Sequence, residues 1–580
     1  MATLTRNLFH GAGEGDWNLE VIDGHWPVDA YGDVFVIGPD KREPAGHWFN
    51  QFGLLHRFSM QAGPDGRLQA RARRMNTPVA MLARKYPRLF HTREFAQVSP
   101  FGVSNMANTN VQTIDGRLFV GYDAGRPIEV DPVTMEVITP VGANGEWAQM
   151  APGLLEPMCP VAAHPAPSWE ERCVYFVNYF PMPGAPTHVA RWGLSGPIER
   201  WPVEGMSPFD SIHDIKATRN HLVFCDLPFR IEAQALSGRG PREIPNQDVT
   251  QLWIIAKEDL RRTPPGQPVQ ATEVQIPIPA GHLMVDVDDD DGILRVHLEH
   301  IALADLMITL AAGETAHSGQ RVVQDHEGIV SIAQQPGCMG SYEILAATGE
   351  IRRAETMWDD RFWGGTLSTY DYSSAQARER VTQAWYCGTG FDPDLVSEQW
   401  WRLYENAGNE HLVDLADLPG EGRPGALAHF DLQSGKVAGV FSYEEPGTFP
   451  SPPTFVPRRD PSGPNDGYVM VLVHRGDWRD GTLGAGKEVH IFDAQDIERG
   501  PLARASAAGF NPPLLLHSYW MDRRVGPRPS NYRVSKMRDV AGALASFVRV
   551  PKTWVGAGRE LRRQAREGTP AGYESSRVEL

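Results

Sequence analysis

Short apolar runs recur along most of the chain, and each is bounded by residues typical of turns. The runs are rich in β-branched and aromatic residues, which favour β-strands. Strands at this density predict an all-β fold, and among sandwich, barrel and propeller the length of the chain favours a propeller. The clearest runs are DVFVIGPD (33–40), GRLFVGYD (116–123), CVYFVNYF (173–180), HLVFCDLPF (221–229), QLWIIAKED (251–259), GILRVHLEH (292–300), GYVMVLVHR (467–475) and KEVHIFDAQD (487–496).

Helical patterns are fewer. Three segments, 78–90, 373–386 and 395–408, have the composition of helices and are expected as insertions between strands.

Charge and cysteine usage narrow the classes of function. The chain of 580 residues has a formal net charge of −17, which argues against an RNA or DNA partner because phosphate contacts need a basic surface. No segment has the pattern of a signal peptide or a spanning helix, so a cytoplasmic protein is expected. Five widely spaced cysteines without a CxxC pair predict reduced core residues: Cys159, Cys173, Cys225, Cys338 and Cys387.

The end of the chain differs from the rest. Residues 521–580 carry 13 lysines and arginines against 6 acidic residues. We therefore expect two parts, a β-propeller catalytic domain over 1–520 and a basic extension over 521–580 packed on it. The segment DVAGALASFVRV (539–550) can form an amphipathic helix. Packing within the chain, a dimer contact and peripheral contact with an anionic membrane remain alternatives for it, and the oligomeric state stays open.

Four of the nineteen histidines stand where strand-like segments begin or end: His164, His213, His282 and His517. A ring of strands can bring four such residues to one axis. Neutral imidazoles suit iron, copper or zinc, and a site without a carboxylate or thiolate ligand leaves a divalent ion its charge and open positions. The residues alone leave open that each is an ordinary core or surface histidine.

An ordered series of motifs resembles the carotenoid cleavage oxygenase family. HWFNQFGLLHRF (47–58) is similar to the family's HWFDGDGMLHxF, and MANTNVQTIDGRLFVGYDAGRPIEVDPVTMEV (106–137) is similar to its early strands. AAHPAP, HDIKAT and AGHLMVDVDDDDGI stand where the family has its first three iron-binding histidines. The run that begins FVPRRDPSGPNDGYVMVLVHRG and ends PPLLLHSYW resembles the closing segment with the fourth. The resemblance covers roughly residues 17–520.

The resemblance implies a fold and a reaction. The fold would be an all-β, seven-bladed β-propeller with helical insertions over one face and one non-haem Fe(II) per chain on its axis. The ligands would be His164, His213, His282 and His517. His297 and His300, on the next strand, are alternatives to His282 as the third ligand. The implied activity is O2-dependent cleavage of a conjugated C=C bond of a carotenoid or apocarotenoid to carbonyl products.

The chain departs from the family where glutamates orient three of the four histidines. Asp123 replaces the glutamate in GYDAGRP, and Pro452 replaces another outright in SPPTFVP. In place of the third glutamate, the segment MWDDRFWGG contains Asp359 and Asp360 as candidates. An aromatic tunnel would hold the substrate, and the tryptophans that either line it or belong to the core are Trp358, Trp363, Trp400, Trp401 and Trp520.

Three other functions compete with this one. Cleavage of a stilbene or other phenylpropanoid alkene would use the same chemistry, with a tyrosine and a lysine near the iron to bind the phenol. The lost glutamates also fit a propeller scaffold without activity. A metal-dependent hydrolase or lactonase would need carboxylate ligands, which the four positions do not supply.

Overall fold

The computed structural model describes residues 9, 11–40, 47–93, 96–180, 186–204, 206, 211–230, 243–331, 333–371, 380–408, 411–445, 447–475, 486–522 and 530–567. Within these ranges the protein is mostly antiparallel β-sheet.

Five four-stranded sheets follow one another along the described chain. The first two contain β8 (Asn110–Ile114), β9 (Arg117–Gly121), β10 (Ile128–Val130) and β11 (Val137–Pro140), then β12 (Ala166–Ser168), β13 (Cys173–Asn178), β14 (His188–Trp192) and β15 (Glu199–Pro202). The third contains β16 (Ser211–Ala217), β17 (His221–Leu227), β18 (Val249–Ala256) and β19 (Thr272–Pro277). The last two contain β20 (Ala280–Val285), β21 (Ile293–His300), β24 (Pro336–Leu345) and β25 (Ile351–Trp363), then β26 (Gly365–Tyr370), β27 (Gln383–Gly388), β28 (Ala426–Asp431) and β29 (Lys436–Ser442).

A nine-stranded sheet joins the two ends of the chain. Its order is β30-β31-β32-β33-β1-β4-β3-β2-β34, so the N-terminal strands lie between C-terminal ones. The strands are β30 (Thr448–Pro457), β31 (Gly467–Arg475), β32 (Lys487–Asp493), β33 (Ala503–Ser506), β1 (Gly15–Gly24), β4 (Leu68–Arg74), β3 (Gly53–Ser59), β2 (Asp33–Pro39) and β34 (Ser518–Met521).

Smaller elements lie between the sheets. Two short sheets contain β5 (His91–Arg93), β6 (Ala96–Ser99) and β7 (Gly102–Val103), and β22 (Asp305–Thr309) with β23 (Val330–Ser331). The helices are α1 (Pro78–Lys85), α3 (Lys257–Arg262), α4 (Glu398–Tyr404) and the long C-terminal α5 (Lys536–Glu567).

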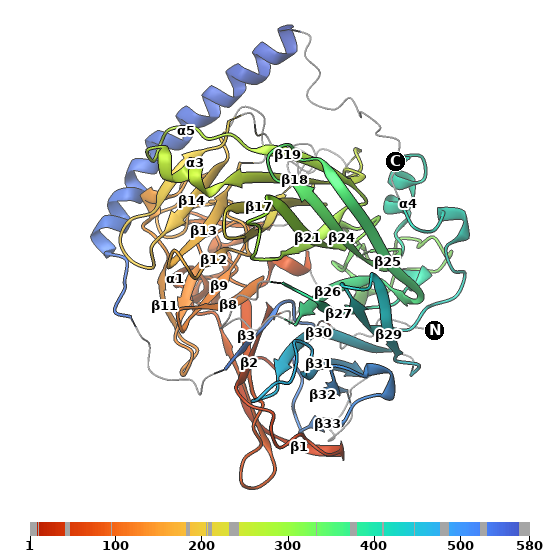
Figure 1. Cartoon of the computed structure of the whole chain (residues 1–580). Coiled ribbons are helices and arrows are strands. Elements are labelled where there is room, and N and C mark those ends of the chain that lie inside the picture. Colours follow the sequence, from red (N-terminus) through yellow and green to blue (C-terminus); the bar gives the residue numbers. More distant parts are fainter. Residues whose placement is uncertain are drawn as a thin grey trace.

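The core is divided among clusters between neighbouring sheets. One cluster holds side chains of β12–β15 and β16–β18, and the next joins β17–β19 to β20, β21 and β24. Four further clusters join the remaining pairs of neighbouring sheets in the same way. Because the nine-stranded sheet packs at both ends of this series, the sheets close into a ring (Figure 1).

The sequence predicted most of these elements. All eight apolar runs contain strands, and the helices expected over 78–90 and 395–408 are present as α1 and α4 with short 3-10 turns. The prediction of a helix over 373–386 is wrong at its C-terminal end, because strand β27 begins at Gln383. Residues 372–379 lie outside the described part of the chain. Trp385 and Tyr386 are buried on opposite faces of β27, which is the pattern of a strand inside a packed sheet.

Helix α5 packs on the ring (Figure 1). Asp539 forms an ion pair of 2.7 Å with the buried Arg126 and accepts a hydrogen bond from the amide of Asn144. Gly542 lies against Gly145, where a Cβ would approach the Gly145 nitrogen to 2.5 Å, so a larger residue could not sit so close. The indole of Trp554 donates to the carbonyl of Met150.

All five cysteines are buried, and none forms a disulfide. Among the described residues, every helix is too short or too polar to cross a bilayer.

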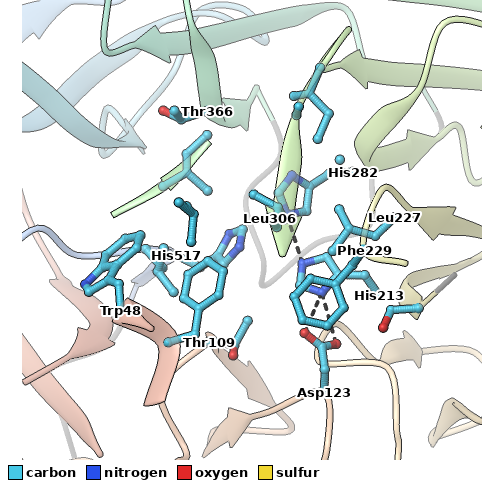
Figure 2. Close-up of a pocket in the computed structure, with 18 of the residues that line it drawn as sticks. Trp48, Thr109, Asp123, His213, Leu227, Phe229, His282, Leu306, Thr366 and His517 are labelled. Carbon is cyan, nitrogen blue, oxygen red and sulfur yellow. Dashed lines mark hydrogen bonds and ion pairs between the residues drawn. The ribbon is translucent and has the colours of Figure 1, made fainter. Parts of the chain in front are cut away.

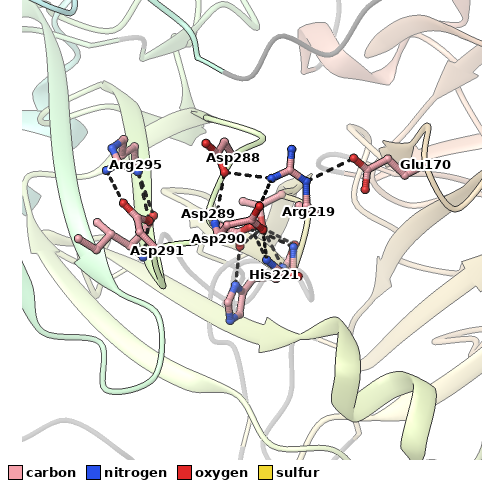
Figure 3. A network of polar contacts seen from close by, with 11 residues as sticks. Glu170, Arg219, His221, Asp288, Asp289, Asp290, Asp291 and Arg295 are labelled. Carbon is pink, nitrogen blue, oxygen red and sulfur yellow. Dashed lines mark hydrogen bonds and ion pairs between the residues drawn. The ribbon is translucent and has the colours of Figure 1, made fainter.

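The acidic turn 286–292, between β20 and β21, contacts the turn between β16 and β17 of the preceding sheet (Figure 3). Both oxygens of Asp289, which is 2% exposed, accept hydrogen bonds from the β16–β17 turn. Arg219 from the same turn pairs with Asp288, Asp290 and Glu170. Burial alone would raise the pKa of the Asp289 carboxyl, but hydrogen bonds from His221, Thr218 and Asn220 hold it below its ordinary value.

We predict that Asp289→Asn destabilises the protein by about 1–2 kcal/mol at pH 7, because an amide nitrogen would face donors that now meet an oxygen. Since the folded-state pKa of Asp289 lies below the unfolded one, its contribution is complete above about pH 4 and is lost as the pH falls further. Denaturant unfolding of the variant and wild type should therefore differ less at pH 3.5, where the unfolded-state carboxyl is already largely protonated, than at pH 7. Asp291→Asn, which weakens an exposed pair with Arg295 and changes an exposed acceptor of the Ile293 amide, should cost less.

Candidate metal centre

Four histidine side chains meet inside the ring (Figure 2 draws three of them). One nitrogen from each of His164, His213, His282 and His517 lies within 4.8 Å of the others. The Nε2 atoms of His164 and His517 are 3.2 Å apart, as are those of His213 and His282. The structure thus brings together all four histidines selected in the sequence.

Backbone hydrogen bonds hold the first two histidines side by side. The amide of His164 donates to the carbonyl of His213, and the amide of Ile215 donates to the carbonyl of His164. His164 lies outside any named strand, in the segment before β12, so these bonds replace a regular sheet partner. The pair fixes the segment between β11 and β12 against the first strand of the next sheet.

β-Bulges occur near the start of four successive first strands. The pairing register shifts at His213 in β16, at Gly281 in β20, at Thr366 in β26 and at Ser451–Pro452 in β30. All but Pro452 line the same cavity. A bulge re-aims a strand and its side chains, so the four strands turn towards the centre at equivalent places.

His517 reaches the centre through pairing of the last strand with β2. The amide of Ile37 donates to the carbonyl of His517, and the amide of Leu516 donates to the carbonyl of Ile37. Val36 then pairs with Ser518 and Val34 with Trp520. The position of the fourth histidine therefore depends on a strand near the N-terminus.

Asp123 orients His213. Its two oxygens lie 3.0 and 2.9 Å from Nδ1 of His213, and Oδ1 also accepts from the amide of Ala163. Burial lowers the pKa of His213, but the charge of Asp123 more than offsets this and raises it. Because a carboxylate can only accept at Nδ1, the neutral form of this ring carries its proton there and leaves Nε2 as an acceptor. The aspartate reaches the ring directly, despite being shorter than the family's glutamate.

Glu299 orients His282. It lies directly across the β20–β21 pair from His282, and its Oε2 is 3.1 Å from Nδ1 of that ring. Its Oε1 accepts from the hydroxyls of Ser368 and Tyr370. Burial raises the pKa of the Glu299 carboxyl, but His282 and these hydroxyls together hold it below its ordinary value. A charged carboxylate is thereby kept in the interior, only 3% exposed.

The expectation that Asp359 or Asp360 supplies this carboxylate is wrong. Both are on β25, which lies at the far edge of the sheet, three strands from β20. At about 4.8 Å per strand this is roughly 14 Å. Asp359 pairs instead with Arg361.

A signal for Glu299 is present in the sequence. The acidic turn 286–292 joins two apolar strands, as in a hairpin, and Val285 pairs with Val296 beside it. Counting back from this pair puts His282 opposite Glu299. The two histidines that flank Glu299 are held elsewhere: His297 bonds to Ser341, and His300 to Ile278 and Tyr342.

Within the described residues, neither His164 nor His517 contacts a carboxylate through its ring. Burial lowers the pKa of both rings well below the ordinary value, and the neighbouring histidines lower it further. Next to Pro452 on β30, Ser451 donates to the carbonyl of Leu515 and so ties this strand to the segment of His517.

The donor set fits a divalent transition metal. Because Asp123 and Glu299 hold protons on Nδ1 of His213 and His282, the two Nε2 lone pairs face each other across 3.2 Å. Such lone pairs repel, and a cation bound by both removes the repulsion. Neutral imidazoles without a carboxylate among them suit iron, copper or zinc rather than calcium or magnesium.

A largely apolar cavity of about 190 Å³ adjoins three of the histidines. Trp48, Phe229 and Leu306 contribute to its wall together with Thr109 and Thr366 (Figure 2). None of the five tryptophans considered from the sequence lines it. Trp363 and Trp400 are core residues, and Trp358 is 43% exposed. Sequence reasoning missed Trp48, although it lies in the HWFNQFGLLH motif.

Comparisons with known proteins agree with this architecture. The family model described as retinal pigment epithelial membrane protein matches residues 8–522. Resveratrol cleavage oxygenase 1 of Aspergillus fumigatus is 24% identical over 88% of this chain and 93% of its own length. Apocarotenoid-15,15'-oxygenase of Synechocystis is 21% identical over 87% of this chain and 94% of its own length.

Solved structures share the fold. A cobalt-substituted Synechocystis apocarotenoid oxygenase has a TM-score of 0.59 at 18% identity, and covers 90% of this chain with all of its own. The lignostilbene dioxygenase of Pseudomonas brassicacearum has a TM-score of 0.59 at 17% identity, with the same coverage. With the family model spanning most of the sequence and four histidines gathered inside the ring, this chain belongs to the carotenoid cleavage oxygenase family of the retinal pigment epithelial membrane protein.

Proposed function

We propose that the protein is a non-haem Fe(II) dioxygenase that cleaves a conjugated C=C bond of a carotenoid or apocarotenoid. The alkene and one O2 would give two carbonyl products, each with one oxygen atom, so the reaction balances without another reductant. The observation that carries this proposal is the convergence of four imidazoles at an apolar cavity.

His164, His213, His282 and His517 would hold one iron per chain through Nε2. The metal would supply the O2 chemistry that amino-acid side chains lack. Asp123 and Glu299 keep the proton on Nδ1 of two rings and so direct their lone pairs inward. The apolar wall would exclude water and hold a long substrate in register, which decides the bond that is cleaved.

For the architecture, we propose a seven-bladed propeller over 1–520, with 521–580 as an extension packed on it. Five four-stranded sheets and the two halves of the nine-stranded sheet would be the blades. Helical insertions would cover one face.

Cleavage of a stilbene is the second candidate. Tyr122 and Tyr179 line the cavity, and the hydroxyl of Tyr179 donates to Ser211, another lining residue. This polar group favours binding of a phenol, and two similar proteins are named for resveratrol and lignostilbene. Against it, no lysine lines the cavity within the described part of the chain.

Iron content tests the metal assignment. Protein purified without added metal should contain about one iron per chain by elemental analysis, and His517→Ala should lose it because a ligand is removed. His297→Ala is a matched control, since His297 is also buried in this region but bonds to Ser341. Negligible iron in wild type after treatment with Fe(II) and a reductant, or equal loss in the control, would contradict the assignment.

Glu299→Gln tests the orienting carboxylate. The variant should bind iron about 10–100-fold more weakly in competition with a chelator, because the hydrogen bond that fixes His282 loses its charge. Asp359→Asn, at the far edge of the sheet, should bind as wild type does. If the Asp359 variant lost affinity and the Glu299 variant kept it, the role given to Glu299 would be wrong.

A substrate screen separates the two candidates. Iron-loaded protein should consume apocarotenals or carotenoids in detergent with one O2 per alkene and yield carbonyl products detectable by mass spectrometry. Turnover of resveratrol or another hydroxystilbene alone would reject the first candidate in favour of the second. An intact site with neither activity would leave a metal-binding scaffold.

A further inference from the structure

Helix α5 exposes an apolar stripe that the body of the protein does not cover. The stripe residues are spaced by three, four or seven positions, with Phe547 and Val548 adjacent, which places them on one side of the helix. Their exposed fractions run from 45% for Phe547 to 85% for Met537. The α5 stripe consists of Met537, Val540, Leu544, Phe547, Val548 and Val555.

A different face of the helix binds the body. Ala543, Ser546 and Val550 are buried there, and Asp539 pairs with Arg126 on the same side. At about 100° per residue, this face is turned by about 130° from the stripe. The contacts therefore fix α5 with its stripe turned outward, and Figure 1 shows the helix along the outer edge of the ring.

The charged residues of α5 indicate which kind of partner covers the stripe. Helix α5 contains eight lysines and arginines and three acidic residues, in a chain with a net charge of −17. Arg538, Lys552 and Arg559 are exposed and, by the same helical spacing, follow one flank of the stripe. Arg538 also forms an ion pair of 2.8 Å with Glu146 of the body, so the positive charge of this flank comes mostly from Lys552 and Arg559. Its one acidic residue in the first three turns, Asp539, is engaged by Arg126.

A second copy of the chain is disfavoured by this arrangement. Antiparallel stripe-to-stripe pairing about a two-fold axis would bring Lys552 and Arg559 of one helix near the same basic flank of the other, which is repulsive. An anionic bilayer instead offers an apolar interior beneath negatively charged headgroups, which matches an apolar stripe with a basic flank.

We propose that the α5 stripe seats in an anionic membrane surface and attaches the protein to one leaflet. Trp554 links this anchor to the cavity, because its indole donates to the carbonyl of Met150, and Met150 lines the cavity wall. The anchored side thus adjoins the binding site for an apolar ligand. The proposal holds independently of the reaction proposed above.

Co-sedimentation of the full-length protein with vesicles tests it. Wild type should bind phosphatidylcholine vesicles that contain phosphatidylserine, and bind weakly to phosphatidylcholine alone or in high salt. Leu544→Glu/Phe547→Glu should lower the bound fraction about tenfold, because two stripe residues become charged. Val28→Glu/Val323→Glu is the matched control, since it changes exposed apolar residues elsewhere. Thermal unfolding of both variants should follow wild type, which shows that they are folded.

Three results would overturn the proposal. One is the absence of wild-type binding to anionic vesicles, and another is equal binding by the stripe variant and wild type. The third is a wild-type dimer in analytical ultracentrifugation that the stripe variant converts to monomer without any vesicle binding, because a second copy would then cover the stripe.

Discussion

Closure of the ring by pairing of the two chain ends is the constraint on which the rest of this structure depends. His164 and His517 are separated by 353 residues, yet their Nε2 atoms are 3.2 Å apart. That contact requires β34 to pair with β2 and β33 with β1. Because a site made from distant segments forms only when every intervening sheet is packed, assembly of the centre is coupled to the whole fold.

Within the closed ring, local irregularity aims the side chains. A regular strand would alternate its residues between the two faces of a sheet, which pack against neighbouring sheets. Bulges in β16, β20, β26 and β30 break this alternation at the inner ends of the strands. The cross-strand position of Glu299 opposite His282 then supplies a charged acceptor for that ring at short range.

The four histidines are held in two different ways. Two rings are oriented by carboxylates, and two lie in an environment that only disfavours their charged forms. For His517, the backbone pairing with β2 and the bond between Ser451 and Leu515 hold the segment that carries the ring. Backbone bonds to His213 and Ile215 do the same for His164. Main-chain constraints therefore stand where carboxylates would otherwise orient the side chains.

The sequence by itself determined the strand-rich class, the family and the four histidines, because apolar runs between turns and ordered motifs are local properties of the chain. It also selected Asp123 as a candidate carboxylate, and this side chain lies 2.9 Å from Nδ1 of His213. It did not place Glu299, the bulges or the strand that replaces a helix at Gln383, since these depend on which strands pair and in which register. Exposure of the α5 stripe was likewise decided by the tertiary structure: an amphipathic pattern predicts an apolar face, but only packing determines which face the body buries.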